Sequence, residues 1–326
     1  MPFMSTVRFN CVQPGLEPNE MSARYQAFVE MARYAEEHGV AMVTLEEHHG
    51  AENGWSPSPM MMAGLVFGTT KTLAITISAL LLPLHDPLRV AEDLAVLDLA
   101  SGGRLTTVLG LGYRPEEYAA HAKDWKHRGN LMDECVDTLL KAWTGEPFDF
   151  RGTTVRVTPR PFTQPHPMVL IGGTSKPAAR RAARFGLPMF AAAAVDGLEA
   201  YYYEQCKEQG TQGFFMDPGG DFASVHVAED PDKVWKELGD HFLHEATTYH
   251  SWQTPDIKSS VHSHASSVDD LRAEGIYQVL TPAEALERAT KYGSLNLHPM
   301  VGGMPIDEGW SSLRLYCEQV LPKVSA

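Results

Sequence analysis

The feature that most constrains the fold of this chain is the alternation of short apolar runs with amphipathic helical patterns. Runs such as Val40–Leu45 and Ala74–Leu82 contain β-branched residues and predict buried strands. Helices with clear start signals stand among these runs, including one at Asp86-Pro87 and a capping box at Thr281–Glu284. No long Pro/Gly linker divides the chain. The pattern therefore favours an α/β fold, a single (β/α)8 barrel of the TIM type over residues 1–326, rather than a doubly wound sheet.

One segment departs from this alternation. Residues 251–275 are rich in Ser, His and Asp and show no clear periodicity. Their composition and length predict a late, mobile insertion near the mouth of the barrel. Such an insertion is either a lid that closes over a bound ligand or a passive surface loop. We expect the passive loop, because most long polar loops have no closing role.

Charge and composition argue against several classes of function. The formal net charge is −14, which disfavours nucleic acid and anionic membranes as partners because their phosphates would be repelled. No apolar stretch is long enough to span a bilayer, and residues 1–5 do not look like a secretory signal. The four cysteines are scattered without paired spacing. We therefore expect reduced, structural thiols in a cytoplasmic protein.

The strongest indication of chemistry follows the apolar run Val40–Leu45. It is the sequence Glu46-Glu47-His48-His49. In a barrel of alternating strands and helices, catalytic groups lie at the carboxyl ends of the strands. A histidine at such a position is suited to proton transfer near neutral pH. The alternative is a polar loop that holds two histidines and has no catalytic role.

A metal site is not expected among these residues. Successive side chains of a strand point to opposite faces, so His48 and His49 cannot both face one barrel mouth unless the strand has already ended. His262 and His264 have a more suitable spacing, but they stand in the Ser-rich segment without a second group of ligands. Hydrogen bonding or proton transfer by a single imidazole is the better interpretation.

Three glycine-containing segments are candidates for binding a phosphate group. The best joins a predicted strand to a helix start, where backbone N–H groups and the helix dipole attract an anion. Its residues are Gly172, Gly173, Thr174 and Ser175, followed by Lys176. A plain capped turn is the alternative interpretation. Gly110-Leu111-Gly112 lacks the further glycine of a dinucleotide fingerprint, and Gly302-Gly303 is more typical of a loop.

Several motifs, in the same order along the chain, resemble the bacterial luciferase-like monooxygenase family. They are Glu47-His48-His49, Ser56–Pro59, Leu82–Asp93, Ser101–Leu105, Gly112–Tyr118, Arg184–Met189 and the closing segment 297–322. The resemblance covers essentially the whole chain. It implies a (β/α)8 barrel that binds a flavin at the carboxyl ends of its strands, usually FMN and in some branches a deazaflavin coenzyme.

The resemblance also implies roles for individual residues. His48 matches the catalytic histidine of the family, with Glu47 and His49 beside it. Ser78-Ala79 matches the position of a non-proline cis peptide bond beneath the flavin ring. The remaining cofactor contacts that it implies are Gly110, Leu111, Tyr113, Arg114, Gly172, Gly173, Thr174, Ser175 and Lys176.

This chain departs from the luciferases at two of these positions. Gly110 stands where they have a reactive cysteine, and Leu111 stands where they have a phosphate-binding arginine. Light emission therefore does not follow from the resemblance. The phosphate would be left to the segment that ends at Ser175, with help from Lys176 or Arg114.

These observations together predict a flavin-dependent oxidoreductase, a monooxygenase that uses reduced FMN and O2 on a small apolar organic substrate. No nicotinamide fingerprint is present, so we expect a separate flavin reductase to supply the reduced FMN. One alternative is hydride transfer with a deazaflavin coenzyme, and another is a flavin-binding protein without catalysis. We also predict a homodimer formed by helices between about Pro59 and Leu99. Trp55 and Met60–Met62 are candidate pocket residues.

Overall fold

The computed structural model describes residues 3–217, 223–253 and 263–324. Its first part contains β1 (Met4–Phe9), α1 (Pro18–Glu37), β2 (Met42–Leu45), α2 (Pro59–Phe67), β3 (Ala74–Leu80), η1 (Leu82–Leu84), α3 (Pro87–Ser101) and β4 (Leu105–Leu109). The middle part contains α4 (Pro115–Ala120), α5 (Arg128–Trp143), the hairpin β5 (Phe148–Phe150) and β6 (Thr153–Val155), β7 (Met168–Gly172), α6 (Lys176–Phe185), β8 (Met189–Phe190), α7 (Leu198–Gln209) and β9 (Phe215–Met216).

The last part contains the longest helix of the described chain, α8. Its elements are β10 (Ser224–Val227), α8 (Pro231–Trp252), α9 (Val268–Glu274), β11 (Tyr277–Leu280), α10 (Pro282–Tyr292), β12 (Ser294–Leu297), η2 (Val301–Gly303), α11 (Ile306–Leu315), the π-helical turn η3 (Tyr316–Val320) and α12 (Leu321–Val324). Strands and helices thus alternate along most of the chain, as the sequence predicts.

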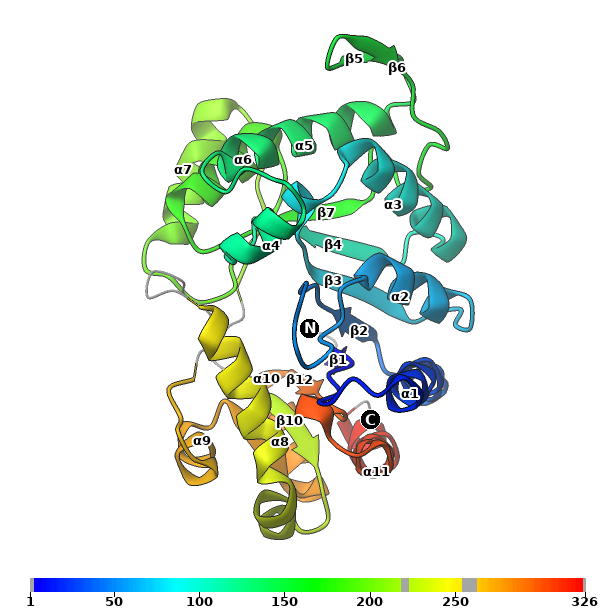
Figure 1. Ribbon diagram of the computed structural model, residues 1–326, viewed down its shortest axis with the longest axis vertical. Helices are drawn as coiled ribbons and strands as arrows, with labels where there is room; N and C mark the ends of the chain where they lie inside the picture. The colour runs from blue at the N-terminus through cyan, green and yellow to red at the C-terminus, as the bar shows by residue number, and fades with distance from the viewer. Residues whose placement is uncertain (1–2, 218–222, 254–262, 325–326) are drawn as a thin grey trace.

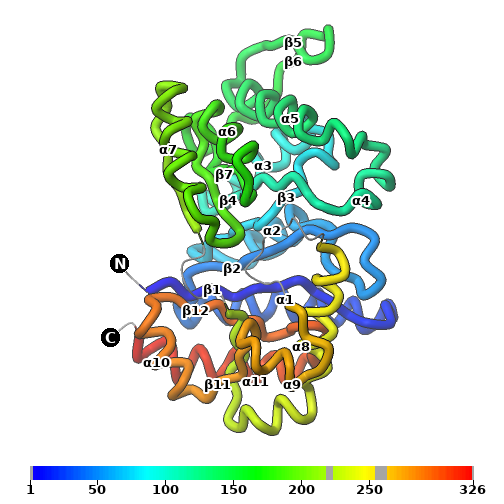
Figure 2. The backbone as a smooth tube through the Cα atoms, turned by 90° about the vertical axis from the view of Figure 1, so that its left-hand side faces the viewer, coloured from blue at the N-terminus to red at the C-terminus, as the bar shows by residue number. Residues whose placement is uncertain are grey.

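Ten parallel strands form one sheet in the order β11-β10-β12-β1-β2-β3-β4-β7-β8-β9. The first and last barrel strands lie side by side, since β1 pairs with β12 as well as with β2. Figure 1 shows the sheet running the length of the molecule, with α1, α2 and α3 along one flank and α8 near the opposite end from α5. Figure 2 shows β1, β2 and β12 in the middle, between the α5–α7 half and the α8–α11 half.

The α/β barrel class of fold is confirmed, with one departure from a simple sequential barrel. β10 lies between β12 and β11, so the last three strands are not in chain order. Among the described residues no strand pairing joins β9 to β11, and hydrogen bonds therefore do not close the ring there. A core of aliphatic side chains from neighbouring strands fills the interior, including Val7, Val43 and Ile75, which are fully buried and in register.

The local signals in the sequence correspond to observed helix starts. The Asp86 side chain accepts hydrogen bonds from the amides of Leu88 and Arg89 at the start of α3. Thr281 and Glu284 form the predicted capping box of α10. These contacts satisfy backbone N–H groups that have no partner within their helix. The helices are therefore positioned by their own sequence before tertiary packing is considered.

The segment 251–275 is only partly described, and its described part is not simply a loop. α8 runs as far as Trp252, and α9 buries Leu271 completely against the neighbouring elements. Residues 254–262, which include His262, lie outside the described residues. The expectation of an insertion or lid stays a prediction.

Two further expectations concern membranes and thiols. Within residues 3–217, 223–253 and 263–324, none of the helices combines the length and apolar character that a membrane crossing needs. The four cysteines are all buried free thiols, in agreement with a structural role.

Candidate active site

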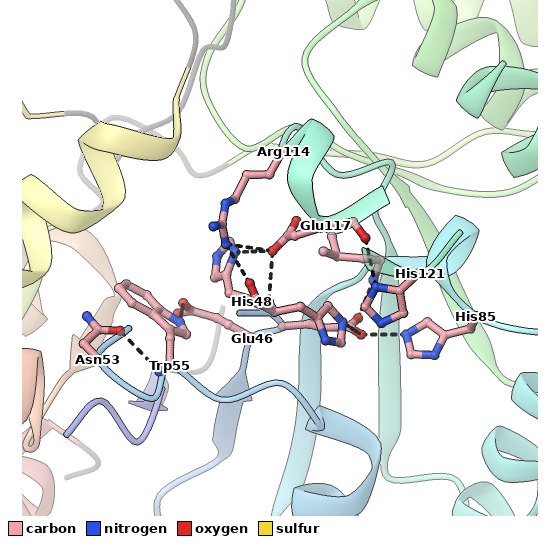
Figure 3. Close-up of polar contacts among 11 residues, drawn as sticks. Glu46, His48, Asn53, Trp55, His85, Arg114, Glu117 and His121 are labelled. Atoms are coloured by element: carbon pink, nitrogen blue, oxygen red, sulfur yellow. Dashed lines mark hydrogen bonds and ion pairs between the residues drawn. The ribbon is translucent and has the colours of Figure 1, made fainter. Parts of the chain in front are cut away.

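The candidate residues gather where β2, β3 and β4 end. β2 ends at Leu45, so the residues after it no longer alternate across a sheet. His48 and His49 can therefore point in different directions without conflict with strand geometry. Figure 3 shows His48 facing Glu117 and Arg114, while Glu46 and Trp55 lie to one side and His85 and His121 to the other.

Glu47 ties the loop after β2 to the loop after β3. It is only 1% exposed. Its Oε1 atom accepts hydrogen bonds from Nε2 of His49 (2.8 Å) and of His85 (2.6 Å), and Oε2 accepts one from the Leu81 amide (2.6 Å). Burial by itself would raise the pKa of Glu47, but these hydrogen bonds lower it from 4.5 to about 2. We refer to Glu47, His49 and His85 as the Glu47 network.

A second buried carboxylate, Glu117 in α4, holds the His48–His49 backbone in place. Its Oε1 atom accepts hydrogen bonds from the His49 amide (2.9 Å) and from Nη1 of Arg114 (3.1 Å). Nη1 of Arg114 also donates to the His49 carbonyl at 2.9 Å. Burial tends to raise the pKa of Glu117, but contacts with His48, the His49 amide and Arg114 outweigh it and lower that pKa.

His48 lies under a group of aromatic rings. Its side chain is largely inaccessible, with the residue 6% exposed. The ring centres nearest to the imidazole belong to Trp252 (4.7 Å), Trp55 (5.3 Å), Tyr249 (5.8 Å) and Tyr113 (6.1 Å). We call these four residues the aromatic roof. Nδ1 of His48 is 3.7 Å from Oε1 of Glu117, and it has no hydrogen-bond partner among the described residues.

Half of the aromatic roof stands on α8, and a buried carboxylate anchors that helix. Oε1 of Glu245 accepts hydrogen bonds from Arg8 (3.1 Å) and Tyr277 (3.2 Å), and Oε2 accepts from Asn10 (2.8 Å) and the Gly302 amide (2.8 Å). Burial would raise the pKa of Glu245, but contacts with His298, Arg8 and Asn10 hold it well below its usual range. We call this group, with Glu46 bound to Arg8, the Glu245 network.

The anchor and the roof residues share one face of α8. Tyr249 is four residues after Glu245 and Trp252 is seven residues after it, which places all three on the same side of a helix. A further link comes from Trp55, whose Nε1 donates to Oε2 of Glu46 at 3.2 Å. The roof is therefore attached to the barrel through two buried carboxylates rather than by apolar packing alone.

Beside this group the paired ends of β3, β4 and β7 form a closely packed shelf that includes Ala79, Gly110 and Gly172. The Ser78–Ala79 peptide bond is cis, as the family resemblance predicts. A Cβ atom at Gly110 would lie 2.8 Å from the Cβ of Ala79, and one at Gly172 would lie 2.8 Å from Cγ1 of Val108. Such contacts are closer than carbon atoms tolerate, so both positions require glycine. The two glycines are therefore needed for close packing between neighbouring strands, and Gly110 itself is buried.

The predicted phosphate segment has the expected local structure. Ser175 is the N-cap of α6, and its hydroxyl accepts a hydrogen bond from the Ala178 amide at 3.4 Å. Thr174 is partly exposed, and Ser175 and Lys176 are exposed. Nζ of Lys176 lies 4.9 Å from the centre of the Tyr201 ring. Arg114, the other candidate cation, is bound to the His49 carbonyl and Glu117, so the structure groups it with His48.

Two sequence expectations need separate comment. Met60–Met62 were candidate pocket residues, but they belong to α2; Met61 is 70% exposed and Met62 is buried against the core. Of that set only Trp55 is beside His48. Glu47, His49 and His85 present potential metal-ligand atoms within 4.8 Å of one another, although sequence reasoning predicts no metal. Their mutual hydrogen bonds already use the same atoms.

Several residues of the site are not predicted by the sequence, or stand in it only as parts of motifs. Glu117 and His85 lie inside family motifs but received no role, and α8 was not predicted. Its signals are nevertheless present: Asp230-Pro231 is the same cap pattern as Asp86-Pro87, and the Asp230 side chain accepts from the Lys233 amide at 3.0 Å. The long polar segment after α8 obscured this pattern.

A match to the model of one family is consistent with this arrangement. The family is described as luciferase-like monooxygenase, and its model matches residues 4–294. The chain belongs to this family. A related sequence is the alkanal monooxygenase alpha chain of Photorhabdus laumondii, 29% identical over 167 residues, which are 49% of this chain and 46% of that protein. The chain spans about half the length of the curated relatives it matches.

Solved structures resemble the chain over its full length. Monooxygenase RslO1 from Streptomyces bottropensis has a TM-score of 0.76 at 23% identity, covering 98% of this chain and 99% of that one. The oxygenating constituent of 3,6-diketocamphane monooxygenase from Pseudomonas putida, solved with FMN, has a TM-score of 0.66 at 16% identity and covers 99% of both chains. An F420-dependent secondary alcohol dehydrogenase also scores 0.66, at 15% identity and 100% coverage of both. At these identities the likeness concerns the fold alone.

Proposed function

We propose that this protein is a flavin-dependent monooxygenase that uses reduced FMN and O2 to oxidise a small, mainly apolar organic substrate. The observation that carries the proposal is the placement of buried His48 at the strand ends that also form the shelf of Ala79, Gly110 and Gly172. Membership of the luciferase-like monooxygenase family supports the reaction class. A structural relative solved with FMN supports the choice of cofactor.

The residues present fit FMN. Gly110 and Gly172 keep the strand ends beside His48 free of larger side chains, and the start of α6 offers the positive end of its helix dipole and the Ser175 hydroxyl to a phosphate. When bound, reduced FMN supplies the two electrons with which one atom of O2 is reduced to water while the other enters the substrate. The protein binds and orients the reactants, and the aromatic roof excludes water from them.

His48 is the residue placed to hold or move a proton. Its Nδ1 atom has no hydrogen-bond partner among the described residues, and Glu117 lies 3.7 Å away. Glu117 keeps the neighbouring backbone fixed through the His49 amide. His48 thus has a fixed position and a nitrogen atom available to a reacting group, which are the two requirements for general acid–base catalysis.

Binding selectivity tests the cofactor assignment. The purified protein should be titrated by calorimetry with FMN, reduced FMN and a deazaflavin coenzyme, followed by turnover assays with a separate flavin reductase. We expect selectivity for reduced FMN. Selective binding of the deazaflavin would instead favour hydride transfer without O2, the chemistry named for one structural relative. Flavin binding with no turnover on any substrate would favour a non-catalytic flavin-binding protein.

A phosphate at the start of α6 can be tested with one substitution. Ser175→Ala should weaken FMN binding more than riboflavin binding, because only FMN carries the phosphate. The substitution also removes the hydroxyl that caps α6, so riboflavin serves as the control for a general loss of structure. Equal losses for the two ligands would place the phosphate elsewhere.

We further propose a homodimer formed through α2 and α3. These adjacent helices expose Met61, Leu65, Val96 and Leu99, which are large apolar residues. Clustered exposed apolar side chains on a folded protein often mark an interface. Light scattering should give a dimer mass, and Met61→Glu with Val96→Glu should shift it toward the monomer. A monomer mass at every concentration of the unmodified protein would rule the interface out.

A further inference from the structure

We propose that the aromatic roof forms one wall of a binding site for a planar aromatic substrate that carries a hydroxyl or carbonyl oxygen. This inference rests on the proposed function, because it assigns a substrate class to the same site. It goes beyond the expectation of a merely apolar substrate. The argument uses the ring contacts around His48 and the polar atoms buried among them.

The rings of the roof contact one another as well as His48. The ring centre of Trp55 is 5.2 Å from that of Trp252 and 5.9 Å from that of Tyr249. The planes of Trp55 and Trp252 meet at 61°, and that of Trp252 is tilted by 41° to the His48 ring. These tilted and edge-to-face arrangements are the ones that aromatic pairs prefer. The roof is therefore a connected cluster of aromatic rings in contact with the candidate catalytic histidine.

This cluster of rings favours an aromatic ligand over an alkyl chain. A planar ligand that enters beside His48 must separate some of the ring contacts in the roof. An aromatic ligand restores contacts of the same kind with Trp55 and Trp252, whereas an alkyl chain restores apolar burial but not the ring-to-ring geometry. The Arg114 guanidinium, 4.4 Å from the centre of the Trp252 ring, stabilises the position of that ring by a cation–π contact.

Two buried polar atoms indicate that the ligand carries an oxygen. Nδ1 of His48, 3.7 Å from Oε1 of Glu117, and the hydroxyl of Tyr113, whose ring centre is 6.3 Å from that of Tyr249, are both buried and lack a close hydrogen-bond partner among the described residues. Burying such groups is unfavourable unless they are hydrogen-bonded. A hydroxyl or carbonyl oxygen on the ligand would satisfy one or both. A hydrocarbon, aromatic or not, would leave them as they are.

Three probes separate these features: 2-naphthol, which is planar and carries a hydroxyl, naphthalene, which is planar only, and decanal, which is an alkyl chain with a carbonyl. Calorimetry should be performed on the flavin-free and the FMN-saturated protein. We expect 2-naphthol to bind most tightly. Trp252→Leu should weaken 2-naphthol and naphthalene by roughly tenfold, the scale of one lost aromatic pair, and change decanal little. Tyr292→Leu removes an exposed aromatic ring on α10 and should change none of them.

Tyr113→Phe tests the polar half of the proposal. It keeps the ring and removes the hydroxyl, so 2-naphthol should bind about fivefold more weakly while naphthalene is unaffected. Circular dichroism checks the folding of each variant. If Trp252→Leu does not fold, the binding of 2-naphthol by Tyr113→Phe tests the proposal. The proposal is overturned if decanal binds as tightly as 2-naphthol, or if Trp252→Leu weakens decanal equally. Binding of 2-naphthol without binding of any flavin would defeat the proposed function but not this site.

Discussion

Two buried carboxylate networks lie close to His48, and they are neutralised in different ways. In the Glu47 network the carboxylate accepts hydrogen bonds from two histidines and a backbone amide. In the Glu245 network the carboxylate meets Arg8, a permanent cation, and Nδ1 of His298 lies 3.3 Å from its Oε1 atom. The first network fixes the loop that carries His48, and the second fixes the helix that carries half of the aromatic roof.

The two networks therefore differ in role: the Glu47 network lies beside the candidate catalytic residue, and the Glu245 network holds a helix in place. A permanent cation such as Arg8 suits a contact that holds the fold together, whereas the Glu47 carboxylate is held by hydrogen bonds beside the candidate catalytic His48. Both networks remove a carboxylate from water, which is unfavourable unless each oxygen has partners. We therefore expect substitutions in the Glu245 network to affect mainly stability, and substitutions around Glu47 and His48 to affect mainly activity.

The largest expected effect is on turnover. His48→Ala should lower turnover by roughly 10²–10⁴-fold, the usual scale for a lost acid–base group, while flavin binding and the unfolding midpoint stay nearly unchanged. The measurement is steady-state turnover at saturating reduced FMN and substrate. Unchanged turnover would show that His48 has no catalytic role. It would also contradict the assignment of catalysis to the region of the Glu47 network.

The next effect is on stability. Glu245→Gln should lower the free energy of unfolding by roughly 3–5 kcal/mol, the scale for removing one partner of a buried ion pair, because it leaves donors of Arg8 and Asn10 without a charged acceptor. Denaturant unfolding measures it. The matched control is Glu37→Gln, which removes an exposed carboxylate 3.9 Å from Arg33 and should change stability by about 1 kcal/mol or less. Similar losses for both variants would contradict the anchoring role.

Acid should weaken the Glu47 network in a defined range of pH. The pKa of Glu47 falls from 4.5 to about 2 on folding, so the charged form stabilises the folded state above pH 4.5 and this contribution is lost as pH falls toward 2. The shift corresponds to about 3 kcal/mol. Glu47→Gln should lack this part of the acid loss. The comparison of unfolding free energies at pH 5 and pH 2.5 isolates it, and parallel curves for the two proteins would refute the linkage.

The smallest expected effect is that of metal ions. Glu47, His49 and His85 have the donor atoms for zinc, but their hydrogen bonds to one another occupy those atoms, and we predict no binding. Zinc at micromolar concentration, or EDTA, should leave the unfolding midpoint unchanged. Binding at 100 times the dissociation constant would stabilise the fold by about 2.7 kcal/mol, so a midpoint that rises with zinc would overturn the prediction.

Much of the fold could be predicted from local sequence. The capped helices at Asp86, Ser175 and Thr281 begin where predicted, because a cap depends on residues only a few positions apart. The order of the last strands could not be predicted in this way. β10 pairs with both β12 and β11 and so lies between them. That order depends on packing between segments far apart in the chain.

Only the part of the candidate site that follows β2 could be predicted from the sequence. Glu47, His48 and His49 are adjacent in the sequence and follow an apolar run, so a local pattern identifies them. Tyr249 and Trp252 contact the His48 ring although they lie far from it in the sequence. Glu245 has no sequence signal of burial, since glutamate is usually exposed. Only the fold brings these groups to the same place.

The single face shared by Glu245, Tyr249 and Trp252 has a consequence for protein engineering. Glu245 lies one turn before Tyr249 and two turns before Trp252. The Glu245 network includes no residue of α8 after Glu245. The last two turns of α8 can therefore be randomised as a cassette while the barrel and the His48 loop are kept constant. A library built on residues 247–252, with the fully buried Ala246 kept, would change which substrates the roof accepts while the core packing of α8 stays in place.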